Sequence, residues 1–222
     1  MKQLLKKLNI NPKNMALYEQ AFIHTSYAYE NNLDYSYETL EFLGDAIVDA
    51  VISDYLYNSN KYHEGEMTKI RASYVCENAL YEYANDLKLS KYVKVGRGED
   101  KSGGKHKKAI LADIFEALMA AIYLDLGYEK VKQIALKIIV PYIEDKNTLL
   151  FSDYKSALQE AVQTTSKSLH YELISTTGPS HNRTFKVAVI IGELTYGIGI
   201  GNSKKEAEQE AAKKALETLA KE

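Results

Sequence analysis

Residues 40–52 read LEFLGDAIVDAVI, and residues 109–126 read AILADIFEALMAAIYLDL. Both stretches are apolar on most faces of a helix, a pattern typical of helices buried in a bundle. Gly127 follows the second stretch, as glycine commonly does at the C-terminal end of a helix. The pattern is helical from residue 1 to about residue 145, so we predict an all-α domain over residues 1–145.

Acidic residues gather on one face of each of the predicted helices. At 100° per residue, four of them fall within an arc of about 80°: Glu38, Glu41, Asp45 and Asp49. Within residues 110–124 the acids are three residues apart and are neighbours on one face: Asp113 and Glu116. Neither stretch supplies an arginine or lysine on the acidic face.

Carboxylates flanked by core positions must be paired or metal-bound, because leaving one bare costs several kcal/mol. Carboxylate oxygens together with water favour Mg²⁺ or Mn²⁺ over zinc. Such a site activates water and stabilises the attacking and leaving oxygens in phosphodiester hydrolysis. The alternative interpretation is that these acids form the solvated faces of two ordinary helices. Spacing alone does not show that the helices meet.

The pattern of the chain changes after residue 152. An amphipathic helix is predicted over residues 154–163, and alternating apolar residues predict strands at 170–175, 185–191 and 194–200. Ser203 and Glu206 form a capping box that begins a last helix. We therefore predict a linker over 146–152 and a small α+β domain of order α-β-β-β-α over 153–222.

Composition limits the classes of protein that fit. The net charge is −2, but it is segregated, with four lysines and no acid in residues 101–108. Cys76 is the only cysteine, so no intrachain disulfide is possible and a reducing compartment fits best. The longest apolar stretch, 110–124, is shorter than a bilayer span of ~20 residues. We expect a cytoplasmic protein without membrane association.

Four motifs together resemble the ribonuclease III family over nearly the whole chain. The segment YETLEFLGDA at 37–46 is similar to the family signature, and a second family segment is visible at 101–104 with 109–117. Residues 24–27 and 64–67 also look like family positions. The chain departs from the usual pattern at Tyr37 and Thr39, where the family has Asn and Arg.

The resemblance implies a homodimeric endoribonuclease that hydrolyses phosphodiester bonds of double-stranded RNA and leaves staggered ends with 5′-phosphates. It implies a role in processing ribosomal and other RNA precursors. Mg²⁺, or Mn²⁺ as a substitute, would be ligated by Glu41, Asp113 and Glu116, with Asp45 as the fourth catalytic acid. The remaining implied residues are two supporting acids and a dimer contact: Glu38, Glu64 and Phe42. An ordinary core position for Phe42 is nearly as plausible.

The C-terminal module resembles a double-stranded-RNA-binding domain, in which three regions contact an A-form duplex. The resemblance implies that Gln159 and Glu160 meet 2′-hydroxyls in one minor groove and that His181 enters the next. Lys204 and Lys205 would span the major groove between them. These lysines begin a helix, where their charge opposes the helix dipole unless a phosphate binds there; two solvated lysines are the alternative.

Three other interpretations are weaker. A non-catalytic RNA-binding or ribosome-associated protein would have no need for uncompensated acids, and a metal-dependent nucleotide hydrolase would leave the C-terminal module unexplained. A phosphate-binding loop at 98–105 fails its pattern because Gly104 stands where lysine is needed. We expect the glycine-rich part of 88–108 to be a basic surface loop, and Pro141 to mark a helix start or a kink.

Overall fold

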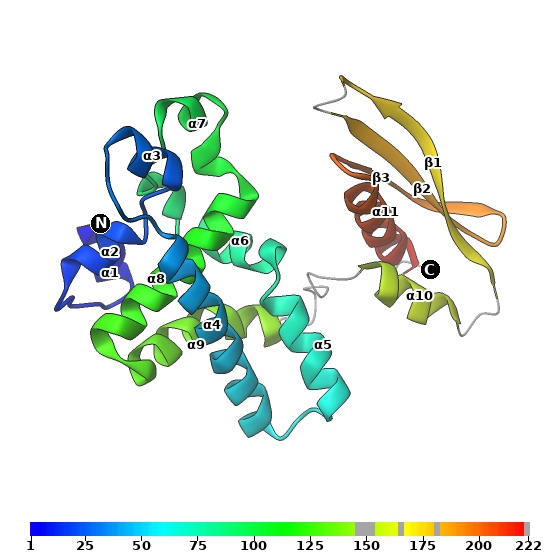
Figure 1. Ribbon diagram of the computed structural model, residues 1–222. Helices are drawn as coiled ribbons and strands as arrows, with labels where there is room; N and C mark the ends of the chain where they lie inside the picture. Colours follow the sequence, from blue (N-terminus) through cyan, green and yellow to red (C-terminus); the bar gives the residue numbers. More distant parts are fainter. Residues whose placement is uncertain (145–153, 164–166, 180–182, 220–222) are drawn as a thin grey trace. The chain divides into compact units, whose positions relative to one another are not determined.

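The computed structural model of the protein describes residues 1–144, 154–163, 167–179 and 183–219. The chain forms two compact units, Met1–Ser152 and Asp153–Glu222, each with its own hydrophobic core (Figure 1). The predicted linker, 146–152, lies outside the described residues. The domain ranges 1–145 and 153–222 therefore stay predictions.

Over residues 1–144 the regular elements of the first unit are helices, with one isolated bridge between Ile23 and Lys94. The all-α class predicted for it is confirmed. The elements in chain order are α1 (Lys2–Lys7), α2 (Met15–Gln20), α3 (Thr25–Glu30), α4 (Glu38–Ser59), α5 (Glu64–Tyr74), α6 (Glu77–Asp86), η1 (Leu89–Lys91), α7 (Arg97–Lys101), η2 (Gly104–His106), α8 (Lys108–Leu126) and α9 (Tyr128–Glu144).

Helix α8 is the centre of this unit and packs against α4, α6 and α9. Its apolar residues are almost all removed from solvent, which explains why the sequence is apolar on most faces of this helix. The helix ends at Gly127, whose φ of 84° is a conformation that glycine adopts without steric cost. Helix α4 crosses α8 (Figure 1) and continues seven residues beyond the apolar stretch 40–52.

The crossing of α4 and α8 depends on one glycine. A Cβ atom added to Gly44 would lie 2.0 Å from the carbonyl oxygen of Glu116. No side chain fits at that distance, so the two backbones touch only because residue 44 has none.

One local expectation was wrong. The glycine-rich segment is not an irregular loop but contains the short helices α7 and η2. Two ion pairs hold it, Lys107 to Glu99 at 2.7 Å and Lys105 to Asp100 at 3.0 Å. Of the two possibilities predicted for Pro141, a helix start is excluded, because Pro141 lies inside the last turn of α9; a kink stays a prediction.

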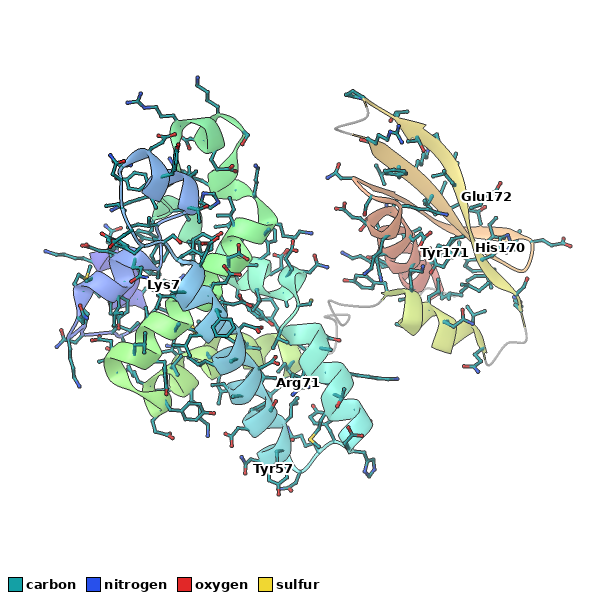
Figure 2. All side chains as sticks on the ribbon, in the orientation of Figure 1. Lys7, Tyr57, Arg71, His170, Tyr171 and Glu172 are labelled. Atoms are coloured by element: carbon teal, nitrogen blue, oxygen red, sulfur yellow. The ribbon has the colours of Figure 1, made fainter. Side chains whose placement is uncertain are left out.

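The second unit is a three-stranded antiparallel sheet of order β1-β2-β3 with two helices, as the predicted α+β class requires. Its elements are α10 (Tyr154–Gln163), β1 (Leu169–Thr177), β2 (Thr184–Ile191), β3 (Leu194–Gly201) and α11 (Lys204–Leu219). On β1, Tyr171 alternates with the exposed His170 and Glu172 (Figure 2), and the Lys155 ammonium lies 4.7 Å from the Tyr171 ring centroid.

Helix α11 packs closely on β3 because glycines face it. A Cβ atom at Gly199 would lie 2.0 Å from the Ala207 carbonyl oxygen, and one at Gly197 would lie 2.3 Å from that of Ala211. The same helix also covers the outer edge of the strand. Lys214 Nζ donates to the Ile198 carbonyl at 2.9 Å, and Thr218 Oγ1 donates to the Tyr196 carbonyl at 3.3 Å.

We predict that Gly44→Ala lowers the free energy of unfolding by about 1–3 kcal/mol, because α4 and α8 must separate to admit the methyl group. Urea denaturation of the full chain measures this. Gly65→Ala is the matched control, since Gly65 lies in α5 and a Cβ atom added to it would meet nothing within 4 Å. The control should be neutral or slightly stabilising, and an equal loss in both variants would contradict the prediction.

Candidate active site

Three carboxylates from two helices meet beside the crossing of α4 and α8. Glu41 lies one turn before Gly44, and Asp113 and Glu116 lie on the face of α8 that α4 covers. One carboxylate oxygen from each of the three lies within 4.8 Å of the others. All three side chains are half-buried. The structure therefore brings together the three acids for which a metal was predicted.

The other predicted acids differ in their distance from this cluster. Asp45 is exposed, and its negative charge raises the pKa of both Glu41 and Glu116. Glu38, also exposed, raises the pKa of Glu41. Asp45 and Glu38 thus lie at the rim of the cluster.

Glu64 is placed apart from the cluster of its own chain. It begins α5, accepts a hydrogen bond from Thr68 at 3.2 Å and lines a groove of about 240 Å³ between α4 and α5. Arg71 and Tyr57 line the same groove (Figure 2). Arg71 donates to Ser53 Oγ at 3.1 Å. Burial raises the pKa of Asp49, and the positive charge of Arg71 partly offsets this rise.

The cluster carries unneutralised negative charge. Burial, followed by the charge of Asp45, raises the pKa of Glu116 to about 8. Burial, followed by the charge of Asp113, raises the pKa of Glu41 to about 7. Among the residues that the structure describes, no lysine or arginine forms an ion pair with these acids.

A hard divalent cation fits this donor set. The three ligand atoms are all carboxylate oxygens, and no histidine nitrogen or cysteine sulfur belongs to the cluster within the described ranges. Oxygen-only sites suit Mg²⁺ and Mn²⁺, whereas zinc prefers nitrogen and sulfur. Positive charge at this point would offset the mutual repulsion that raises the pKa values of the acids.

Tyr37 contacts the cluster directly, which the sequence did not indicate. Its side chain is 5% exposed, and its hydroxyl donates to Asp113 Oδ2 at 2.8 Å. Burial, followed by the charge of Asp113, raises the pKa of Tyr37 above its ordinary value, so the hydroxyl keeps its proton. From the sequence, Tyr37 stood out only as a departure beside the acids.

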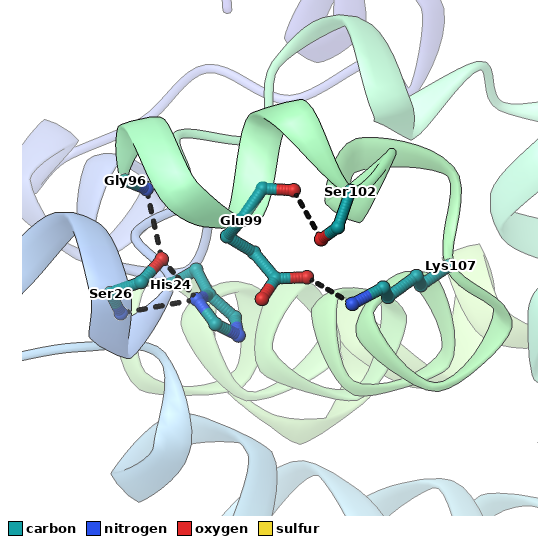
Figure 3. Close-up of polar contacts among 6 residues, drawn as sticks. All are labelled: His24, Ser26, Gly96, Glu99, Ser102 and Lys107. Atoms are coloured by element: carbon teal, nitrogen blue, oxygen red, sulfur yellow. Dashed lines mark hydrogen bonds and ion pairs between the residues drawn. The ribbon is translucent and has the colours of Figure 1, made fainter. Parts of the chain in front are cut away.

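His24, in the segment 24–27 that resembles the family, lies beside the ring of Tyr37. The rings of His24 and Tyr37 are 5.7 Å apart between centroids. Figure 3 shows how His24 is held: its Nδ1 lies 2.7 Å from Ser26 Oγ and accepts from the Ser26 backbone N–H at 3.1 Å. Ser26 Oγ in turn accepts from the Gly96 N–H at 2.8 Å.

Phe42 is 83% exposed on α4, so an ordinary core position is excluded for it.

In the second unit, Gln159 is exposed on α10, and Lys204 and Lys205 are exposed in the first turn of α11. The side chain of Glu160 and the whole of His181 lie outside the described residues.

The cap predicted for α11 is present in a modified form. Ser203 Oγ accepts from the Glu206 N–H at 3.1 Å. The Glu206 carboxylate accepts from the N–H of Asn202, one residue earlier than in a standard capping box. Lys204 and Lys205 therefore begin a helix whose first turn is fixed.

The comparison with known protein families decides the identity of both units. A family model described as ribonuclease-III-like matches residues 14–143, and a model of the double-stranded RNA binding motif matches residues 154–219. The chain belongs to the ribonuclease III family. The signature residues at 37–46 predicted this membership.

Relatives of this ribonuclease III match over nearly their full length. Ribonuclease 3 of Onion yellows phytoplasma is 44% identical, over 98% of this chain and 91% of the relative. Ribonuclease 3 of Listeria monocytogenes is 43% identical, over 98% of this chain and 96% of the relative. The solved nuclease domain of ribonuclease III from Campylobacter jejuni aligns with a TM-score of 0.61 at 35% identity, covering 66% of this chain and 98% of that domain.

The nuclease unit and the RNA-binding motif together make this chain an endoribonuclease of double-stranded RNA. Members of the family depend on metal ions, and the acidic cluster is a site that could bind one. Over the described ranges, no helix combines the length and the apolar character needed to cross a membrane.

The raised pKa values predict how the metal-free protein responds to pH. Since Glu41 and Glu116 bind protons more tightly in the folded chain than in the unfolded one, folding is favoured at low pH, and this stabilisation is lost as pH rises through about 7 and 8. In EDTA, Glu116→Gln should therefore gain stability relative to wild type as pH rises from about 4.5 to about 8, with no further gain above that pH.

Thermal unfolding at several pH values measures this difference. Glu19→Gln is the control, because Glu19 is exposed on α2 and outside the cluster. A stability difference between Glu116→Gln and wild type that does not change with pH would show that the Glu116 carboxylate is not perturbed.

Proposed function

We propose that this ribonuclease III hydrolyses double-stranded RNA with Mg²⁺ held by Glu41, Asp113 and Glu116, leaving staggered ends with 5′-phosphates. The observation that supports this most directly is the meeting of the three carboxylates within 4.8 Å. Two helices, α4 and α8, supply them, and no lysine or arginine in the described part of the chain forms an ion pair with them.

Each acid has a role that follows from its place. When bound, Mg²⁺ lowers the pKa of water and stabilises charge on the phosphate oxygens. Glu41, Asp113 and Glu116 hold the ion, and Mn²⁺ is an acceptable substitute for the same oxygen ligands. Asp45, exposed at the rim, helps to align the ion and the attacking water, as the family resemblance implies. Glu38 supports Glu41 from the first turn of α4, and a supporting role for Glu64 stays a prediction from the resemblance.

We further propose that the enzyme acts as a homodimer with one site for each RNA strand. Phe42 is exposed and directly follows the proposed ligand Glu41, which fits a contact between two copies beside the sites. Another structure of the Campylobacter jejuni nuclease domain, 37% identical and with a TM-score of 0.59, covers 63% of this chain and 95% of that domain, and is described for flexibility in a region involved in dimer formation.

The RNA-binding motif would position the duplex. Gln159 and Glu160 would contact one minor groove and His181 the next, while Lys204 and Lys205 bind the phosphates between them. This arrangement reads A-form shape over ~16 base pairs rather than sequence. Ribosomal and other RNA precursors in the cytoplasm are the substrates we propose, as the family resemblance implies.

The central test is Glu116→Gln, which should reduce cleavage of a long RNA duplex by a factor of about 100 or more, because a carboxylate ligand is lost while the shape of the side chain is kept. Gels of reactions with Mg²⁺ or EDTA measure cleavage, and a mobility shift in EDTA measures RNA binding. Binding should be unchanged. Equal cleavage by Glu116→Gln and wild type would exclude this site, and the exposed Glu19→Gln variant should behave as wild type.

A second test concerns the RNA-binding motif. Lys204→Ala combined with Lys205→Ala should weaken duplex binding for all sequences alike. It should also reduce the slope of log K against log salt by roughly 0.7–0.9 for each phosphate contact removed. Lys167→Ala is the control, because Lys167 is exposed beside the Gly192 turn, at the opposite end of β3 from the start of α11. Unchanged salt dependence in the double variant would assign the lysines to solvent.

A further inference from the structure

Asp113 differs from the other two clustered acids in having a hydrogen-bonded partner. Within the described part of the chain, the Tyr37 hydroxyl is the one side-chain donor to Asp113, at 2.8 Å. No side chain there donates to Glu41 or Glu116. Asp113 is therefore the acid whose orientation is fixed before any ion binds.

Tyr37 is itself held at both ends. Its backbone N–H donates to the Ile23 carbonyl at 2.9 Å, and its own carbonyl accepts from the Glu41 N–H at 2.8 Å. The same residue thus bonds the backbone of one proposed ligand and the side chain of another. The phenol ring is almost fully buried, so the hydroxyl has little freedom to move away from Asp113.

His24 restricts the ring from a neighbouring position. The two rings are 52° apart in orientation, and His24 is fixed by Ser26, which is bonded to Gly96 (Figure 3). A chain of contacts therefore runs from the start of α7 to the proposed metal ligand. A buried aromatic ring held in such a network gives a rigid support rather than an adjustable one.

We infer that Tyr37 is a positioning residue of the metal site: its hydroxyl holds one oxygen of Asp113 and leaves the other for the ion. The inference rests on the proposed function of the cluster. Residues that orient metal-bound carboxylates typically change metal affinity by roughly 10–100-fold when they are replaced. The chain would thus use tyrosine for this task at a position where the family signature usually has Asn.

The test is Tyr37→Phe in the full chain, which removes the hydroxyl and keeps the ring. Mn²⁺ is the probe, with free Mn²⁺ measured by electron paramagnetic resonance and Mg²⁺ affinity obtained by competition. We expect Mn²⁺ to bind about tenfold more weakly than to wild type. The Mg²⁺ concentration for half-maximal cleavage should rise by a similar factor, with a smaller loss of rate at saturating Mg²⁺.

Tyr18→Phe is a matched control. Tyr18 is also fully buried in the first unit, and its hydroxyl donates to a carboxylate, Asp125, at 2.9 Å, but Asp125 is outside the cluster. Both variants lose one hydroxyl–carboxylate bond, so urea denaturation should show similar losses of stability. Only Tyr37→Phe should lose metal affinity.

The outcomes distinguish failure of the positioning role of Tyr37 from failure of the proposed metal site. Wild-type affinity for Mn²⁺ in Tyr37→Phe would overturn the positioning role, and so would an equal loss of affinity in Tyr18→Phe. Asp113→Asn tests the site itself: if it binds Mn²⁺ as wild type does, the proposed ligand set is wrong, and the inference falls with it. Loss of Mn²⁺ in both Asp113→Asn and Tyr37→Phe, with Tyr18→Phe unaffected, supports both.

Discussion

The contact between α4 and α8 at Gly44 is the constraint on which the active site depends. With no side chain at that residue, the backbone of α4 rests on the Glu116 carbonyl, and the carboxylates of Glu41, Asp113 and Glu116 are forced into one small space. Like charges so close, half-buried and without cations, oppose folding. The apolar surface that α8 buries against α4, α6 and α9 must offset this opposition. The same helix packing that forms the core therefore also holds the acids of the site in place.

Much of this arrangement could be predicted from the sequence because it is local. The helical period showed that Glu41 and Asp45 share a face, and that Asp113 and Glu116 share another. The order of helices and strands gave both domain classes. The family signature then indicated which acids belong together, something that periodicity could not show, since nothing in a helical pattern says which two helices touch.

The features that could not be predicted depend on contacts between distant or unexpected residues. Tyr37 reaches Asp113 across 76 positions of sequence, and a tyrosine in place of the usual residue gave no sign of a bond to an acid. The glycine-rich segment read as a loop because its glycines dominate the local pattern. In the structure it contains two short helices, and Glu99 and Asp100 pair with lysines on the far side of those glycines. Residue type alone could not show whether Phe42 lies in the core or at the surface, and the structure places it at the surface.

The covered edge of β3 has a consequence for the behaviour of the molecule in a crowded solution. Sheets extend by adding strands where backbone groups are unpaired, and a linear aggregate needs such an edge on both sides of every unit. In this sheet, Lys214 and Thr218 occupy outward carbonyls of β3, which leaves β1 as the open side. A strand added at β3 would have to displace these two bonds, whereas one added at β1 would not. Helix α11 thus hinders association through the β3 edge and also forms a layer of the core.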